Sequence, residues 1–168
     1  LKIAKENEKI NFSVPTGNFG DVYSGYVAKK MGLPINKLII ATNKNDILTR
    51  VVKTGVYKPS EVKHTISPSM DIQVASNFER LIFDICSEDS KKTSKLMNNL
   101  NKRGEIKFEE KELRKIRENF YSESLTEEET ETTISQIYKN QKLLIDPHTA
   151  VGIGVMTKIK LKENTVIL

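Results

Sequence analysis

The stretch Phe12-Ser13-Val14-Pro15-Thr16-Gly17-Asn18-Phe19-Gly20-Asp21 decides the expected fold of this 168-residue chain. Apolar and polar side chains alternate up to Val14, which is typical of a strand, and Pro15 and Gly17 end it. Apolar residues at helical spacing begin at Val22. A strand, a glycine-bearing turn and a helix in this order point several backbone N–H groups at one spot, where the positive end of the helix dipole adds to them.

The turn therefore predicts an anion-binding site, because glycines let a phosphate approach the backbone without a Cβ in the way. Its spacing fits neither the Walker A motif nor the G-x-G-x-x-G dinucleotide turn. An ordinary strand-to-helix turn, in which Gly and Asp serve geometry alone, is the competing interpretation.

Outward from this turn, strand and helix patterns alternate. We expect a helix over about residues 19–31, a buried strand over 37–41 and a helix from Ile47 to a cap at Gly55. A further helix should begin at a Ser76–Glu79 capping box. Short connections between such elements predict a parallel sheet built from βαβ units. The expected fold class is α/β, with a mostly parallel open sheet flanked by helices and an appended helical region.

The chain is expected to form one partial domain whose parts differ in pattern. Helices over 90–103 and 109–120, and one starting at a Thr126–Glu129 capping box, each have a narrow apolar stripe, which predicts a peripheral position. A helix beginning at Asp146-Pro147 has no polar face in its first turns, which predicts burial. We therefore divide residues 1–168 into a phosphate-loop α/β part (1–86), peripheral helices (87–142), and a buried helix with a terminal strand (143–168).

Composition narrows the expected setting and partners. The net charge is +5, but the lysines are spread along the chain among glutamates, which indicates a solvated surface rather than a nucleic-acid site. No apolar run has the length of a membrane span. Cys86 is the one cysteine and lies on the apolar face of an expected helix, so we expect a core residue in a reducing, cytoplasmic compartment. No metal-ligand pattern is predicted.

Further motifs follow the glycine turn in order, and together they are far more specific than the turn alone. They are Ala41-Thr42-Asn43-Lys44-Asn45-Asp46, Ser67-Pro68-Ser69-Met70-Asp71-Ile72, Ser76-Asn77-Phe78-Glu79-Arg80 and Asp146-Pro147-His148-Thr149-Ala150-Val151. With Val-Pro-Thr-Gly-Asn-Phe-Gly-Asp, this series resembles the threonine synthase family. These are fold-type II, tryptophan synthase beta-like enzymes that use pyridoxal 5'-phosphate (PLP). The resemblance covers most of the chain and is weakest over residues 87–142.

The resemblance implies two sets of site residues. Cofactor-binding residues would be Gly17, Asn18, Phe19, Gly20 and Asp21, with backbone N–H groups and the Asn18 amide on the phosphate. Because a carboxylate repels a phosphate, Asp21 is expected to cap free N–H groups instead. Substrate-pocket candidates are Asn43, Asn45, Asp46, Ser69 and His148. The asparagines and Asp46 could equally be turn and cap residues, and His148 could be a packing residue.

The family's Schiff-base lysine, in a Phe-Lys-Asp run, has no match in this chain, so we expect it upstream of Leu1 and assign no catalytic residue here. The hydroxyl that faces the pyridine nitrogen would follow Leu168. The chain is thus expected to be the C-terminal part of an enzyme that converts O-phospho-L-homoserine and water to L-threonine and phosphate. By itself it should be inactive and should self-associate through uncovered sheet. Another fold-type II PLP lyase and a non-catalytic anion-binding or regulatory module remain the alternatives.

Overall fold

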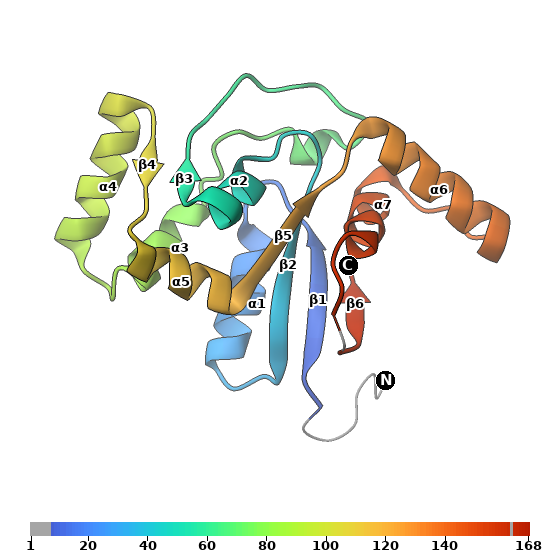
Figure 1. The fold of residues 1–168 in the computed structure, drawn as a ribbon, viewed down its shortest axis with the longest axis horizontal. Coiled ribbons are helices and arrows are strands. Elements are labelled where there is room, and N and C mark those ends of the chain that lie inside the picture. Colours follow the sequence, from blue (N-terminus) through green and yellow to red (C-terminus); the bar gives the residue numbers. More distant parts are fainter. Residues whose placement is uncertain (1–7, 162) are drawn as a thin grey trace.

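A four-stranded parallel sheet forms the centre of the molecule in the computed structural model, which describes residues 8–161 and 163–168 (Figure 1). The strands lie in the order β5-β2-β1-β6. Their bounds are Phe120–Ser124 for β5, Ile35–Thr42 for β2, Ile10–Pro15 for β1 and Thr165–Ile167 for β6. Strands β2 and β5 therefore lie on one side of β1, and the last strand of the chain, β6, pairs with β1 on its other side.

The two faces of the sheet carry separate apolar clusters. Because side chains alternate along a strand, Leu38 and Ile40 of β2 join one cluster, whereas Ile39 and Ala41 join the other. The first face is covered by α1 (Gly20–Lys30), α2 (Ile47–Thr54), α3 (Phe78–Ile85) and α5 (Glu110–Asn119). The second is covered by α7 (Pro147–Gly154) and the 3-10 turn η2 (Val155–Thr157).

Local sequence signals account for most helix ends. Gly55 closes α2 in a left-handed conformation (φ 75°), and its N–H donates to the Val51 carbonyl at 2.8 Å. The predicted capping box of Thr126 and Glu129 opens α6 (Glu127–Gln141). Helix α4 (Ser90–Arg103) ends at Gly104 and stands apart from the main sheet (Figure 1), beside the antiparallel pair β3 (Val56–Tyr57) and β4 (Ile106–Lys107).

Helix α7 packs closely against the sheet at Gly152. A Cβ on Gly152 would lie 3.2 Å from Pro15 Cγ and 3.1 Å from Ile167 Cγ2. The Ser13 hydroxyl donates to the Gly152 carbonyl at 2.7 Å, which ties β1 to the helix. The chain from α7 to β6 therefore closes the sheet on the side of β1 that β2 leaves open.

Two expectations from the sequence were wrong. Residues 87–142 are not only peripheral helices, because β4 and the sheet strand β5 lie among them, and Phe120 begins β5 instead of ending a helix. The capping box expected at Ser76 and Glu79 does not form. Asn77 occupies the N-cap of α3 without a side-chain bond, since Ser76 donates instead to the side chain of Asn18.

In the described parts of the chain, no helix is long and apolar enough to cross a membrane. Cys86 is a buried free thiol next to the apolar face of α3, as predicted.

Candidate functional site

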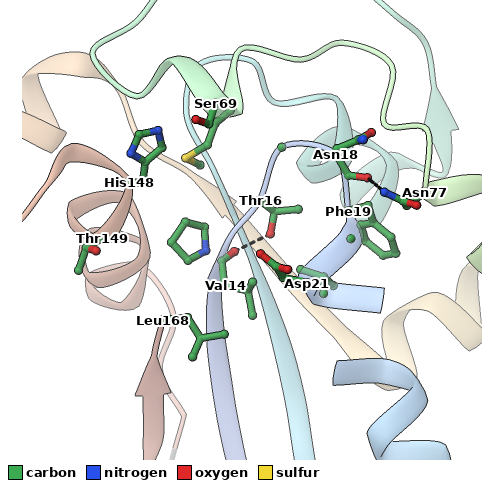
Figure 2. Close-up of a pocket in the computed structure, with 15 residues that line it drawn as sticks. Val14, Thr16, Asn18, Phe19, Asp21, Ser69, Asn77, His148, Thr149 and Leu168 are labelled. Atoms are coloured by element: carbon green, nitrogen blue, oxygen red, sulfur yellow. Dashed lines mark hydrogen bonds between the residues drawn. The ribbon is translucent and has the colours of Figure 1, made fainter. Parts of the chain in front are cut away.

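A cavity of about 450 Å³ opens past the carboxyl end of β1 (Figure 2). Its walls come from the β1–α1 turn, the 3-10 turn η1 (Pro68–Met70), the start of α3, the start of α7 and the residue after β6. Ligands of open α/β sheets bind at the carboxyl ends of strands, where the strand order reverses. The cavity lies at that place, because β2 and β6 flank β1 on opposite sides.

The turn between β1 and α1 leaves a row of backbone N–H groups without acceptors. The Thr16 N–H donates to the Ala41 carbonyl at 2.8 Å, and the Tyr23 N–H donates to Phe19 at 3.1 Å. Between these two, the N–H groups of residues 17–22 have no hydrogen-bond acceptor within 8–161 and 163–168. Val22 is nevertheless fully buried at 0% exposure. Because buried N–H groups are almost always paired, the row indicates a ligand that supplies acceptors.

Phe19 gives this row its curvature. Its backbone is left-handed (φ 68°), and a left-handed residue followed by helix turns successive N–H groups toward one concave spot. The conformation is costly for a residue with a side chain, and aromatic packing holds it in place. The Phe19 ring is buried and meets the Phe78 ring edge-on, with 5.2 Å between centroids, and the Phe120 ring at 5.8 Å.

Neighbouring segments fix the rest of the turn. The Ser76 N–H and hydroxyl donate to Asn18 Oδ1 at 2.6 and 2.8 Å, and Asn77 Nδ2 donates to the Asn18 carbonyl at 3.1 Å. On the other side, Gly17 lies against η1 so closely that a Cβ there would be 2.5 Å from the Ser69 carbonyl oxygen. The turn is therefore shaped before any ligand arrives.

The acidic side chains at the starts of α1 and α7 differ in whether they cap their helix. The Asp146 carboxylate caps α7, accepting the N–H groups of His148 and Thr149 at 2.8 and 3.2 Å. The Thr149 hydroxyl is the main cause that lowers the pKa of Asp146 to about 2. At α1 no side chain caps the first N–H groups, and Asp21 makes no hydrogen bond within the described residues. An incoming anion thus finds free donors at α1 and occupied ones at α7.

Comparison with known proteins identifies relatives of the chain, although no family model matches it. Threonine synthase of Pseudomonas aeruginosa is 41% identical over 153 residues, which cover 91% of this chain and 33% of the relative. Threonine synthase of Saccharomyces cerevisiae is 42% identical over 174 residues, covering 95% of this chain and 34% of the relative. A PLP-bound threonine synthase structure from Brucella melitensis superimposes with a TM-score of 0.96 at 44% identity, and the match covers 99% of this chain and 36% of the Brucella chain.

The chain is homologous to threonine synthases. It spans about a third of the length of these relatives. The resemblance to threonine synthases and the expected α/β fold class are confirmed, since the matched structure is a PLP enzyme of that fold and the parallel sheet is flanked by helices.

The predicted phosphate-loop residues line the cavity, but the role expected of Asp21 changes. Gly17, Asn18, Phe19, Gly20 and Asp21 all lie on its wall. Ser76 occupies only the Asn18 side-chain oxygen, so a role of the Asn18 Nδ2 group on the phosphate stays a prediction. Asp21 does not cap the helix, because Phe19 occupies the N-cap of α1. Figure 2 shows the Asp21 carboxylate on the cavity side of α1.

The predicted substrate-pocket residues separate into two groups. Ser69 and His148 line the cavity, whereas Asn43, Asn45 and Asp46 do not. Asn43 and Asn45 are buried at the end of β2, and both donate to Asp71 Oδ1, at 2.8 and 2.9 Å. Asp46 accepts from Arg50 Nε at 2.9 Å. These residues hold the loop that leads to η1, so they support one wall of the cavity from behind.

The sequence analysis missed several lining residues, among them Asn77 and Thr149. Both lie on the cavity wall, at the starts of α3 and α7 (Figure 2). Each belongs to a motif on which the resemblance rests, so the motifs themselves were the signal. In the part of the chain that the structure describes, no group of three or more His, Cys, Asp or Glu side chains could hold a metal ion.

Proposed function

We propose that this chain provides the cofactor-phosphate cradle of a threonine synthase, which converts O-phospho-L-homoserine and water to L-threonine and phosphate. The observation that carries the proposal is the row of acceptor-free N–H groups at residues 17–22, on the wall of the cavity, in a chain that is 41% identical to a threonine synthase. Because the chain spans about a third of its relatives, the activity is proposed for the complete protein.

The donor set fits the phosphate of PLP. A phosphate dianion brings several acceptor oxygens, and a helix start with free N–H groups satisfies them while the helix dipole favours the charge. The Phe19 ring anchors the turn in the core, and Ser76 and Asn77 hold Asn18, so the donors need little rearrangement on binding. When bound, PLP supplies the electron sink that stabilises negative charge on the substrate carbon. The role of this chain is to place the cofactor.

Other parts of the proposal go beyond the cradle. We expect the 168 residues alone to release no phosphate from O-phospho-L-homoserine, since no run in them matches the family's lysine motif. Phosphate release above the uncatalysed background would refute this expectation. A reducing, cytoplasmic setting is part of the proposal and is supported by the buried free thiol of Cys86.

A pair of substitutions at Asp21 tests the cradle. Proline lacks an N–H and is tolerated in the first helical turn, and Gly20 before it has no Cβ to clash with the ring. Asp21→Pro therefore removes one donor of the row, whereas Asp21→Ala removes the carboxylate and keeps the donor. The PLP affinity of both variants is measured in the complete protein by absorbance titration, and thermal melting confirms that each variant is folded.

We expect Asp21→Pro to weaken PLP binding about 10- to 100-fold, the range for one lost hydrogen bond to a charged group. Asp21→Ala should bind PLP at least as tightly as the wild type. Pyridoxal without its phosphate should bind all three proteins weakly and alike. Equal PLP affinity of a folded Asp21→Pro protein and the wild type would contradict the cradle.

A further inference from the structure

Asn77 uses its side chain in a way that its place in the chain does not predict. It is the N-cap of α3, where an asparagine side chain usually accepts an N–H of its own helix. Here the side chain makes no capping bond, and its Nδ2 donates instead to the Asn18 carbonyl at 3.1 Å. Figure 2 shows this bond at the β1–α1 turn, and Asn77 belongs to the cavity wall. A residue that departs from its local preference is a candidate for a role in the site.

The contact with Asn18 decides which atom of the Asn77 amide faces the turn. A backbone carbonyl can only accept, so the facing atom is the nitrogen and not the oxygen. Nδ2 carries two hydrogens, and the bond to Asn18 uses one of them. Within 8–161 and 163–168, Nδ2 makes no second hydrogen bond, and the bond to Asn18 lies at an exposed position that a molecule in the cavity can reach. Asn77 therefore has one free donor at the cavity wall.

Gly20 brings this donor close to the row of free backbone N–H groups. Gly20 is the first residue of α1, and its N–H belongs to the row at residues 17–22. A Cβ on Gly20 would lie 3.5 Å from Asn77 Nδ2, so no side chain separates the nitrogen from this part of the turn. Asn18, the other neighbour of Nδ2, also contributes an N–H to the row. An anion that accepts from the row therefore lies beside the free hydrogen of Asn77.

Other side-chain hydrogens on the cavity wall are already committed. The Thr16 hydroxyl donates to the Val14 carbonyl, and the Thr149 hydroxyl donates to Asp146. No lysine or arginine is among the described residues that line the cavity, so an anion there depends on neutral donors. The second hydrogen of Asn77 is such a donor.

We propose that Asn77 is a ligand-contacting residue, whose second Nδ2 hydrogen binds an oxygen of the phosphate held by the β1–α1 turn. The proposal rests on the function proposed above. The ligand class is a phosphate monoester, and PLP is the member that the cradle is expected to hold. One hydrogen of Asn77 then fixes the turn, and the other binds the anion that the turn collects.

Variants of the complete protein test this contact. Asn77→Ala removes the amide, and Asn77→Asp keeps nearly the same shape but donates no hydrogen bond when ionised. Neither loses a capping bond, and Asp is as favourable as Asn at an N-cap, so we expect both to fold. Asn98→Ala and Asn98→Asp are the matched controls, because Asn98 is exposed on α4 and does not line the cavity. PLP and pyridoxal are titrated into each protein, and urea unfolding confirms the fold.

NMR separates a phosphate contact from a role that only shapes the turn. The side-chain amide of Asn77 is assigned by its absence from both Asn77 variants, and its two hydrogens resonate separately. We expect one of them to shift when PLP is added, and also when inorganic phosphate is added. The other, which binds the Asn18 carbonyl, should change little.

We expect Asn77→Ala to weaken PLP binding about tenfold, the lower end of the range for one hydrogen bond to a charged group. Asn77→Asp should weaken it further, because a carboxylate repels the phosphate. Pyridoxal, which has no phosphate, should bind the wild type and all variants alike. Both Asn98 variants should bind PLP as the wild type does.

Two results would overturn the proposal: unchanged PLP affinity in a folded Asn77→Ala protein, or an Asn77 amide whose hydrogens both stay in place when PLP binds. A loss of affinity without an NMR shift is the second case, and it would mean that Asn77 only shapes the turn. If Asn77→Ala does not fold, Asn77→Asp and the NMR decide. A wild-type protein that binds no PLP would refute the proposed function instead, and the NMR titration with inorganic phosphate would still judge Asn77.

Discussion

Gly17 and Gly20 sit three residues apart in the same turn, and the structure predicts opposite results for Gly17→Ala and Gly20→Ala. A Cβ on Gly17 would lie 2.5 Å from the Ser69 carbonyl oxygen, 3.1 Å from Ile72 Cδ1 and 3.2 Å from Met70 Cα. The first and third of these are backbone atoms of η1, which cannot rotate away. Neither glycine has a positive φ, so the cost arises from the contact and not from backbone strain.

The magnitude follows from the distances. Carbon needs about 3.5 Å from its non-bonded neighbours, so Gly17→Ala must separate the turn from η1 by up to about 1 Å. Overpacking of this kind costs about 1–3 kcal/mol of unfolding free energy. A Cβ on Gly20 would meet only Asn77 Nδ2, at the ordinary distance of 3.5 Å. Because Gly20 is the first residue of α1, alanine there should leave the unfolding free energy unchanged or raise it by up to about 1 kcal/mol.

Urea unfolding and PLP titration of both variants check the prediction. Gly17→Ala should lose about 1–3 kcal/mol of unfolding free energy at an unchanged m-value. It should also bind PLP more weakly, because the separated turn no longer presents its donors together. Gly20→Ala supplies the control for helix propensity. If the two variants unfold at the same urea concentration as the wild type, the close packing of Gly17 against η1 is refuted.

Three further predictions concern residues around the site. Asn43→Leu should cost about 3 kcal/mol of unfolding free energy, because the buried Asn45 N–H loses its acceptor and Ser67 and Asp71 each lose one donor; a urea midpoint equal to that of the wild type would exclude a structural role. Asp146→Ala should cost about 1 kcal/mol at neutral pH through the lost cap of α7. Folding lowers the pKa of Asp146 from 3.8 to about 2, so the wild type should exceed Asp146→Ala in unfolding free energy by the full amount above pH 3.8, and the difference should shrink as the pH falls toward 2. A difference in urea unfolding that does not change with pH would contradict this prediction. Burial raises the pKa of the Cys86 thiol, so a thiol reagent should label it only as the protein unfolds, and rapid labelling of the native protein would show that the thiol is accessible.

The sequence predicted the β1–α1–β2–α2 half of the fold well, because each element there carries its own signal. Alternation marks β1, an apolar run marks β2, and Gly55 ends α2 in the left-handed conformation that favours glycine. Strand β5 carries no such signal. Phe120 continues the helical spacing of Ile116, and only pairing with β2, eighty or so residues earlier in the chain, makes this segment a strand. A pattern within a short window cannot contain that information.

The candidate site was predictable as far as the backbone determines it. The glycine turn indicates an anion cradle whatever its side chains do, and the predicted phosphate-loop residues do line the cavity. Side-chain roles were less predictable, because residues distant in the sequence determine the partners of the Asn18 and Asn43 side chains. Ser76 donates a hydrogen bond to Asn18 Oδ1, and Asn43 Nδ2 donates one to Asp71 Oδ1. His148 could be placed near the cavity from its motif, but its contact with Asp146 is a side-chain detail that the motif does not specify.

The pairing of β1 with β6 has a consequence for synthesis on the ribosome. Asn11 and Phe12 pair with Thr165 and Val166, so β1 leaves the ribosome long before its neighbour exists. At about 5–20 residues per second, the wait is roughly 8 to 30 seconds. During it, β1 can pair with β2, but its other edge stays bare and α7 has not yet covered the second face. A nascent chain should therefore acquire cofactor affinity only late, and chaperones that mask strand edges should matter most in that interval.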